Sequence, residues 1–136
     1  IVRHHMRPFL LGQLDGLPTR RAIYRFFRDT GATGVDICLL SLADMLATYG
    51  PTLKQEDWAQ HLDVIRGLLE AWWEHPQEQV APPPLVNGHE LMDALGLDPG
   101  PEIGQLLDAI REAQAVGTLD TKEQALQLAR QLFEKN

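Results

Sequence analysis

The sequence has little that would support a disulfide, a cysteine metal site or a membrane span. Its one cysteine, Cys38, excludes a disulfide framework within the chain and predicts a reducing, cytoplasmic environment. There is no signal-peptide pattern. No apolar run approaches the about 20 residues that a membrane helix needs, so we expect no membrane partner. The chain opens with Ile1 rather than Met, and its first residues resemble the interior of a polypeptide, which predicts a fragment.

Signals for β-strands are also lacking, and every strongly periodic segment has the spacing of a helix. The 136 residues are 44% hydrophobic and 23% charged, as in ordinary globular proteins. We therefore predict an all-α fold, a helical bundle of about seven helices. The expected helices are 1–12, interrupted or ended near Pro8, then 19–30, 34–49, 52–75, 88–95, 101–117 and a last helix from about 121.

Capping signals and apolar stripes set these boundaries. Thr19 is a suitable N-cap, and Thr52 with Gln55 and Asn87 with Glu90 have the spacing of capping boxes. In helix 52–75 a stripe at three- and four-residue steps predicts the buried face: Trp58, Leu62, Ile65, Leu69 and Trp72. His61 and His75 are then expected at the surface or at a helix end.

The run Ala81-Pro82-Pro83-Pro84 cannot continue a helix and predicts a stiff, extended spacer. It divides the chain into two sub-modules. Residues 1–80 form a helical body, and residues 85–136 form a three-helix tail.

A net charge of −7 argues against nucleic-acid binding, but the charge is unevenly distributed. Residues 1–30 carry six arginines and two aspartates, whereas the rest of the chain carries six basic and seventeen acidic residues. Helical spacing places Arg21, Arg25 and Arg28 on one face, with Arg20 beside them. This face is either a polyanion-binding surface or a solvated helix face.

The most apolar helix carries an aspartate in its middle, in the segment Leu42-Ala43-Asp44-Met45-Leu46-Ala47. This segment, together with His4-His5, resembles the closing half of an HD-type metal-dependent phosphohydrolase domain. The upstream His and the His-Asp pair of that family are absent. We therefore expect Asp44 to be a buried, hydrogen-bonded polar anchor, with metal binding by His5 and Asp44 as the alternative.

Three blocks in the second half of the chain occur in a fixed order. They are Gly88-His89-Glu90-Leu91-Met92, Gly96-Leu97-Asp98-Pro99-Gly100-Pro101-Glu102-Ile103-Gly104 and Glu112-Ala113-Gln114 followed by Gly117-Thr118-Leu119-Asp120-Thr121-Lys122-Glu123-Gln124-Ala125. Together with Pro18–Arg28 and the Leu-Ala-Asp helix, they resemble the C-terminal region, an HD-like body and a tail, of bacterial tRNA nucleotidyltransferases, which are CCA-adding enzymes and related poly(A) polymerases.

This resemblance implies a part that holds tRNA through backbone contacts and carries no transfer site. The family's head binds Mg²⁺ through paired aspartates after a Gly-Ser dipeptide, and this sequence has no Asp-x-Asp. We therefore expect no catalytic residue and no cofactor here, and an inactive fragment. Alternative functions are a fragment of an HD-type phosphohydrolase, or a helical interaction module that self-associates.

The helix that opens at Gly100-Pro101 offers unpaired N–H groups to a phosphate, and Gly104 would allow close backbone approach. Asp98 and Glu102 would repel the same phosphate, so an ordinary helix start remains the alternative. The predicted RNA-binding residues are Arg20, Arg21, Arg25, Arg28, Gly100 and Gly104.

Overall fold

The protein is all-α, as predicted. In the computed structural model, which describes residues 2–12 and 16–135, those residues form seven α-helices, two short helical turns and no strand. In chain order the elements are α1 (Arg7–Gly12), α2 (Arg20–Thr30), α3 (Thr33–Tyr49), η1 (Gly50–Thr52), α4 (Gln55–Glu74), η2 (Pro76–Val80), α5 (Gly88–Leu95), α6 (Pro101–Ala115) and α7 (Lys122–Lys135).

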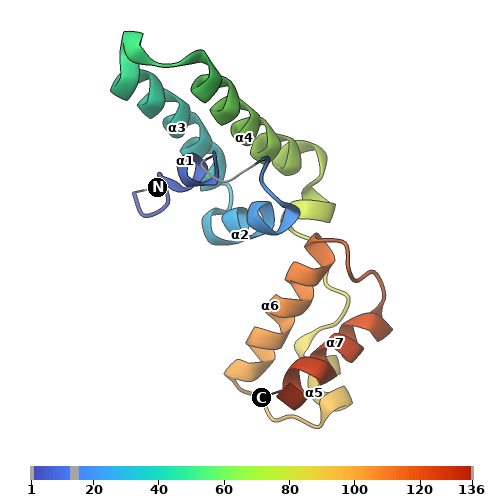
Figure 1. Cartoon of the computed structure of the whole chain (residues 1–136). Coiled ribbons are helices and arrows are strands. Elements are labelled where there is room, and N and C mark those ends of the chain that lie inside the picture. The colour runs from blue at the N-terminus through green and yellow to red at the C-terminus, as the bar shows by residue number, and fades with distance from the viewer. Residues whose placement is uncertain (1, 13–15, 136) are drawn as a thin grey trace.

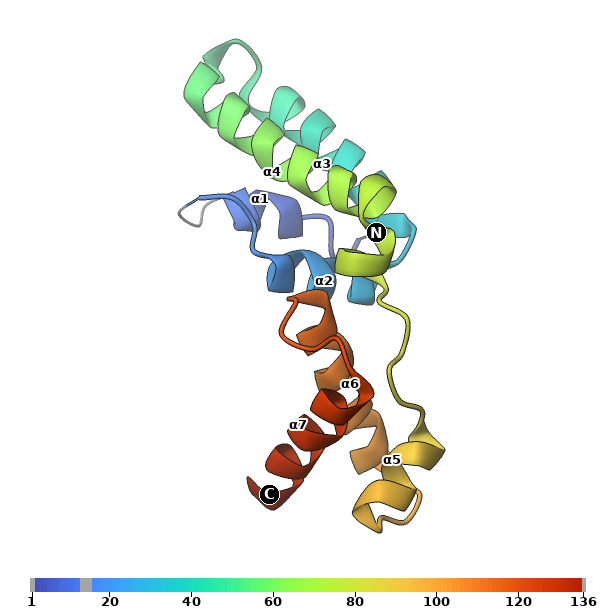
Figure 2. The ribbon, with the colours of Figure 1, turned by 90° about the vertical axis from the view of Figure 1, so that its right-hand side faces the viewer.

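The helices form two groups, which lie one above the other (Figures 1 and 2). Each group has its own hydrophobic core. In the first, α3 and α4 form a hairpin joined by η1, α1 packs against it, and α2 lies across its base (Figure 1). The second core lies between α5, α6 and α7. The buried residues of the first are Ile23, Phe26, Phe27, Ile37, Cys38, Val64, Ile65, Leu68, Ala71 and Val80. Those of the second are Val86, Leu91, Ile103, Leu106, Ile110, Ala125 and Ala129.

The segment between the cores is extended and held in place. Val80 packs into the first core and Val86 into the second. Between them Pro82 is buried, and the side-chain amide of Gln114 donates a hydrogen bond of 2.7 Å to the carbonyl oxygen of Pro83. The C-terminal end of α6 thereby lies against the connection and against α2.

Two predicted helix starts are wrong. The first helix begins at Arg7, and Pro8 lies in its first turn, where the missing N–H of proline has no helical partner to lose. The fourth begins at Gln55 after Lys54 rather than at Thr52. The Thr52 hydroxyl instead donates to the carbonyl oxygen of Tyr49, which closes the turn between α3 and α4.

Within the described ranges no single helix is long and apolar enough to cross a membrane. Residues Arg20–Thr30 and Thr33–Thr52 would reach that length and hydrophobicity only as a pair bent by 107°.

Candidate nucleic-acid interface

One side of helix α2 carries the exposed arginines, and the other side packs into the first core. The Thr19 hydroxyl accepts a hydrogen bond of 3.1 Å from the amide of Ala22, which confirms the predicted cap. Gly31 ends the helix at φ 59°, a conformation that favours glycine. The apolar residues of α2 turn inward, and the four arginines remain exposed: Arg20, Arg21, Arg25 and Arg28.

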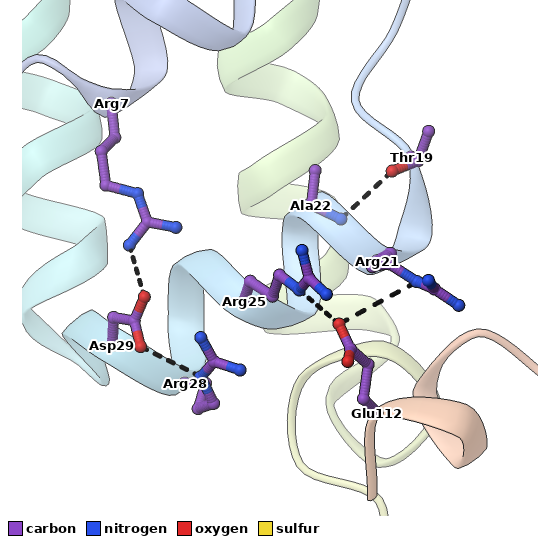
Figure 3. Close-up of polar contacts among 8 residues, drawn as sticks. All are labelled: Arg7, Thr19, Arg21, Ala22, Arg25, Arg28, Asp29 and Glu112. Atoms are coloured by element: carbon purple, nitrogen blue, oxygen red, sulfur yellow. Dashed lines mark hydrogen bonds and ion pairs between the residues drawn. The ribbon is translucent and has the colours of Figure 1, made fainter. Parts of the chain in front are cut away.

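Arg21 and Arg25 contact a carboxylate on α6, a helix of the second core. Both guanidinium groups approach Oε1 of Glu112 on α6 through Nε, Arg25 by a short hydrogen bond and Arg21 at 3.9 Å (Figure 3). The arginine side chains are 56% and 50% exposed, whereas that of Glu112 is 18% exposed. The two arginines therefore lie where α2 contacts α6.

Asp29 joins the end of α2 to α1. Its two carboxylate oxygens accept from Nε of Arg28 at 3.0 Å and from Nη1 of Arg7 at 2.9 Å (Figure 3). Partial burial alone would raise the pKa of Asp29, but these hydrogen bonds outweigh it and lower the pKa. The same bond to Asp29 raises the pKa of Arg28. Arg7 also lies over the Phe26 ring, 5.5 Å from its centre.

Tyr24 on α2 is also buried. Burial raises the pKa of its phenol, and the positive charge of Arg111 on α6 partly opposes this rise. Asp108 acts in the same direction as burial. The charged side of α6 thus faces α2 with both signs, and the arginine face is mixed rather than uniformly positive.

Arg20 makes different contacts from the other three arginines. Its Nη2 is 3.4 Å from the carbonyl oxygen of Glu78, and its Nη1 is 3.1 Å from where a Cβ on Gly117 would lie. Arg20 therefore contacts η2 and the turn between α6 and α7.

The structure does not bring Gly100 and Gly104 next to the arginines. Both are exposed at the start of α6, and an added Cβ at either would meet no atom of the described residues within 4 Å. Gly104 and Glu112 are eight residues apart on α6, which corresponds to about 12 Å along the axis. Neither glycine is required by packing within the chain, and Gly100 has the extended φ of 179° that other residues also adopt.

The expectation that Asp44 is a buried anchor is wrong, because its side chain is exposed on α3. The buried polar residue of that helix is Ser41, whose hydroxyl lies 3.0 Å from Nε2 of His61. His61 is 3% exposed, which contradicts its predicted surface position, whereas His75 does end α4. Burial lowers the pKa of His61, and a hydrogen bond to the backbone of Ser41 opposes this.

The described residues do not support the alternative of a metal site at His5 and Asp44. The Nδ1 atom of His5 is 2.7 Å from the carbonyl oxygen of Val2, and Asp44 lies in solvent. In the part of the chain that the structure describes, no three His, Cys, Asp or Glu side chains are close enough to hold a metal ion.

Known proteins match this chain over most of its length. Residues 78–129 match the family described as tRNA nucleotidyltransferase domain 2, putative. The chain is 39% identical over 126 residues to the CC-adding tRNA nucleotidyltransferase of Thermus thermophilus. The matched residues make up 92% of this chain and 25% of that protein. The chain is also 39% identical over 90 residues to the A-adding tRNA nucleotidyltransferase of Deinococcus radiodurans, 66% of this chain and 20% of that protein.

A third relative is the CCA-adding enzyme of Streptococcus mutans, 30% identical over 105 residues, 77% of this chain and 25% of that protein. The chain therefore spans about a quarter or less of the length of these relatives. No solved structure matches it.

Proposed function

The chain belongs to the tRNA nucleotidyltransferase family, in which it corresponds to a C-terminal region, and from this premise we propose that it holds tRNA through phosphate contacts. The whole protein then adds CCA, CC or A to tRNA 3′ ends, using Mg²⁺ bound in another part of the polypeptide. The residues of this chain supply affinity and orientation.

The observation that carries the proposal is the arginine face of α2. Arg21, Arg25 and Arg28 follow one another along one side of a helix whose other side is fixed in the first core. Together with Arg7 they supply four positive charges, whereas the carboxylates that pair with them, Asp29 and Glu112, supply two negative charges. An excess of positive charge therefore remains on this face of an otherwise acidic chain.

The chemistry of the face suits an RNA backbone. A guanidinium group presents five N–H donors in a planar fork that matches a phosphate. Structured RNA is recognised mainly through its shape, its phosphates and its 2′-hydroxyls, which requires donors on a rigid support rather than a groove that reads bases. We also propose a second, weaker contact at Gly100 and Gly104, where open space at the start of α6 would let a phosphate approach the backbone.

The test is tRNA binding by the chain as a function of salt. A fluorescently labelled tRNA transcript is titrated with protein between about 50 and 200 mM KCl, a range over which binding that neutralises several phosphates weakens by orders of magnitude. We expect weak binding that is insensitive to the RNA sequence. The logarithm of the association constant should fall linearly with the logarithm of the salt concentration. The double variant R21A/R25A should bind more weakly, with a slope lower by about one unit for each phosphate that the protein no longer neutralises.

The matched control is R66A/R130A, which removes the same charge from exposed positions on α4 and α7. Circular dichroism establishes that both double variants are folded. If the two reduce affinity equally, the chain attracts RNA only by its overall charge, and the assignment to α2 is wrong. Salt-independent binding, or none, by the unaltered chain would refute the proposed function.

A further inference from the structure

Arg21 and Arg25 share one carboxylate, and both reach it through Nε. Among the described residues, the hydrogen bonds and ion pairs of these two guanidinium groups all go to Glu112, and both are made through Nε. Nε is the edge of the guanidinium group nearest the helix. The Nη groups at the far edge take no part in these contacts, so four N–H donors on each arginine are left for another acceptor.

The exposed fractions of the three side chains agree with this arrangement. Glu112 is 18% exposed, while both arginine side chains are half exposed, so the carboxylate lies inside and the guanidinium groups lie outside. Figure 3 shows both side chains converging on Glu112 from successive turns of α2. A carboxylate that competed with phosphate for the outer edge would instead cover the Nη groups.

Glu112 is itself well supported. It lies in the last turn of α6, two residues before Gln114, whose side chain is bonded to the carbonyl oxygen of Pro83. Ile110 and Ala115, on either side of it, are buried. The tail thus presents the carboxylate from a fixed position.

We propose that Glu112 is a positioning residue that orders Arg21 and Arg25 with their Nη edges toward an RNA phosphate, so that the RNA-holding face is a composite of body and tail. This inference rests on the proposed function. A free arginine side chain loses rotamer freedom when it binds, and prior ordering by a neighbour removes much of that loss. An ion pair at this exposure adds little stability of its own.

Two substitutions separate positioning from charge. Both E112Q and E112A remove the negative charge, which by itself should favour phosphate binding. Only glutamine keeps an oxygen that accepts from Nε at the same place. Positioning therefore predicts that E112Q binds the labelled tRNA at least about fivefold more tightly than E112A, since ordering one long side chain costs about that factor.

A double-mutant cycle shows whether the effect passes through the arginines. In the R21A/R25A background, E112A and E112Q should bind equally, because the side chains that Glu112 positions are gone. Equal binding of E112A and E112Q in the unaltered background would overturn the inference, as would the same fivefold gap in both backgrounds, which would indicate an effect on the fold. If R21A/R25A alone leaves binding unchanged, the proposed function fails as well. If R21A/R25A weakens binding and the two Glu112 variants do not differ, only the inference fails.

Discussion

At the scale of single residues, His61 and Ser41 form a polar pair inside the first core. The pKa of His61 is lowered, so its native state disfavours the proton that the unfolded chain accepts near pH 6.5. Between the folded and unfolded pKa values the unfolded state binds more protons, and stability therefore falls as the pH drops below about 6.5. We expect a loss of at most about 1.4 kcal/mol per pH unit from this one group.

Thermal unfolding of the wild type, H61Q and S41A between pH 7.5 and pH 5 measures this effect. H61Q should lose less stability than the wild type over the range, because its replacement does not titrate. S41A is the control: it removes the hydroxyl that contacts Nε2 but keeps the imidazole buried, so the pH dependence of its stability should resemble that of the wild type. Parallel pH profiles for the wild type and H61Q would show that His61 does not contribute.

The same pair shows what the sequence could not decide. Helix 34–49 is apolar on most sides, so its hydropathy predicts burial for any polar residue in it and does not distinguish Ser41 from Asp44. Helix α4 decides between them: its buried residues include His61, Val64 and Leu68, whereas Trp58 and Leu62 of the predicted stripe are only partly buried. A hydroxyl that is hydrogen-bonded to an imidazole is satisfied in the core, whereas a carboxylate there would have needed a cation.

At the scale of helices, two glycines give opposite predictions for the same substitution. A Cβ on Gly34, at the start of α3, would lie 2.6 Å from Oγ1 of Thr30 and 2.9 Å from a ring carbon of Phe27. On Gly104, in α6, it would meet no atom within 4 Å in the part of the chain that the structure describes. We expect G34A to destabilise the fold by about 1–3 kcal/mol through overpacking. G104A should stabilise it by up to about 1 kcal/mol through helix propensity.

Urea denaturation of the two variants measures both effects, and each variant is the control for the other. Equal changes in the free energy of unfolding would mean that the residues around Gly34 accommodate the added methyl group without loss of stability. The labelled tRNA tests G104A a second time. Weaker binding by this more stable protein would indicate that the RNA backbone approaches α6 closely there, whereas unchanged binding would remove Gly104 from the proposed contacts.

Local signals predicted most of the elements, because a cap is a contact between residues near in sequence. Thr19 and the reciprocal bonds of Asn87 and Glu90 are found as predicted. The contact between Arg25 and Glu112 joins residues 87 positions apart, and it exists only because the end of α6 packs on α2. Periodicity places the arginines on one face but carries no information about which carboxylate that face meets.

At the scale of the whole molecule, the charge distribution has a structural explanation. The acidic residues outnumber the basic ones, 19 to 12, yet Asp29 and Glu112 are placed so that each touches two arginines. Each carboxylate also links separate elements, Asp29 joining α1 to α2 and Glu112 joining α6 to α2. The excess acidity lies elsewhere, so the chain can orient toward a polyanion through one face while its net charge is negative.

The last prediction concerns chemistry rather than binding. Nucleotide transfer through two metal ions needs carboxylates held close enough to bridge them. The sequence has no Asp-x-Asp, and in the residues that the structure describes no cluster of three potential ligands occurs. We therefore expect the 136-residue chain to add no radiolabelled CMP or AMP to tRNA lacking its 3′ end, with Mg²⁺ or Mn²⁺, under the same conditions as the proposed binding test. Incorporation that purifies with the chain and is abolished by replacing one of its own carboxylates would place a transfer site within it.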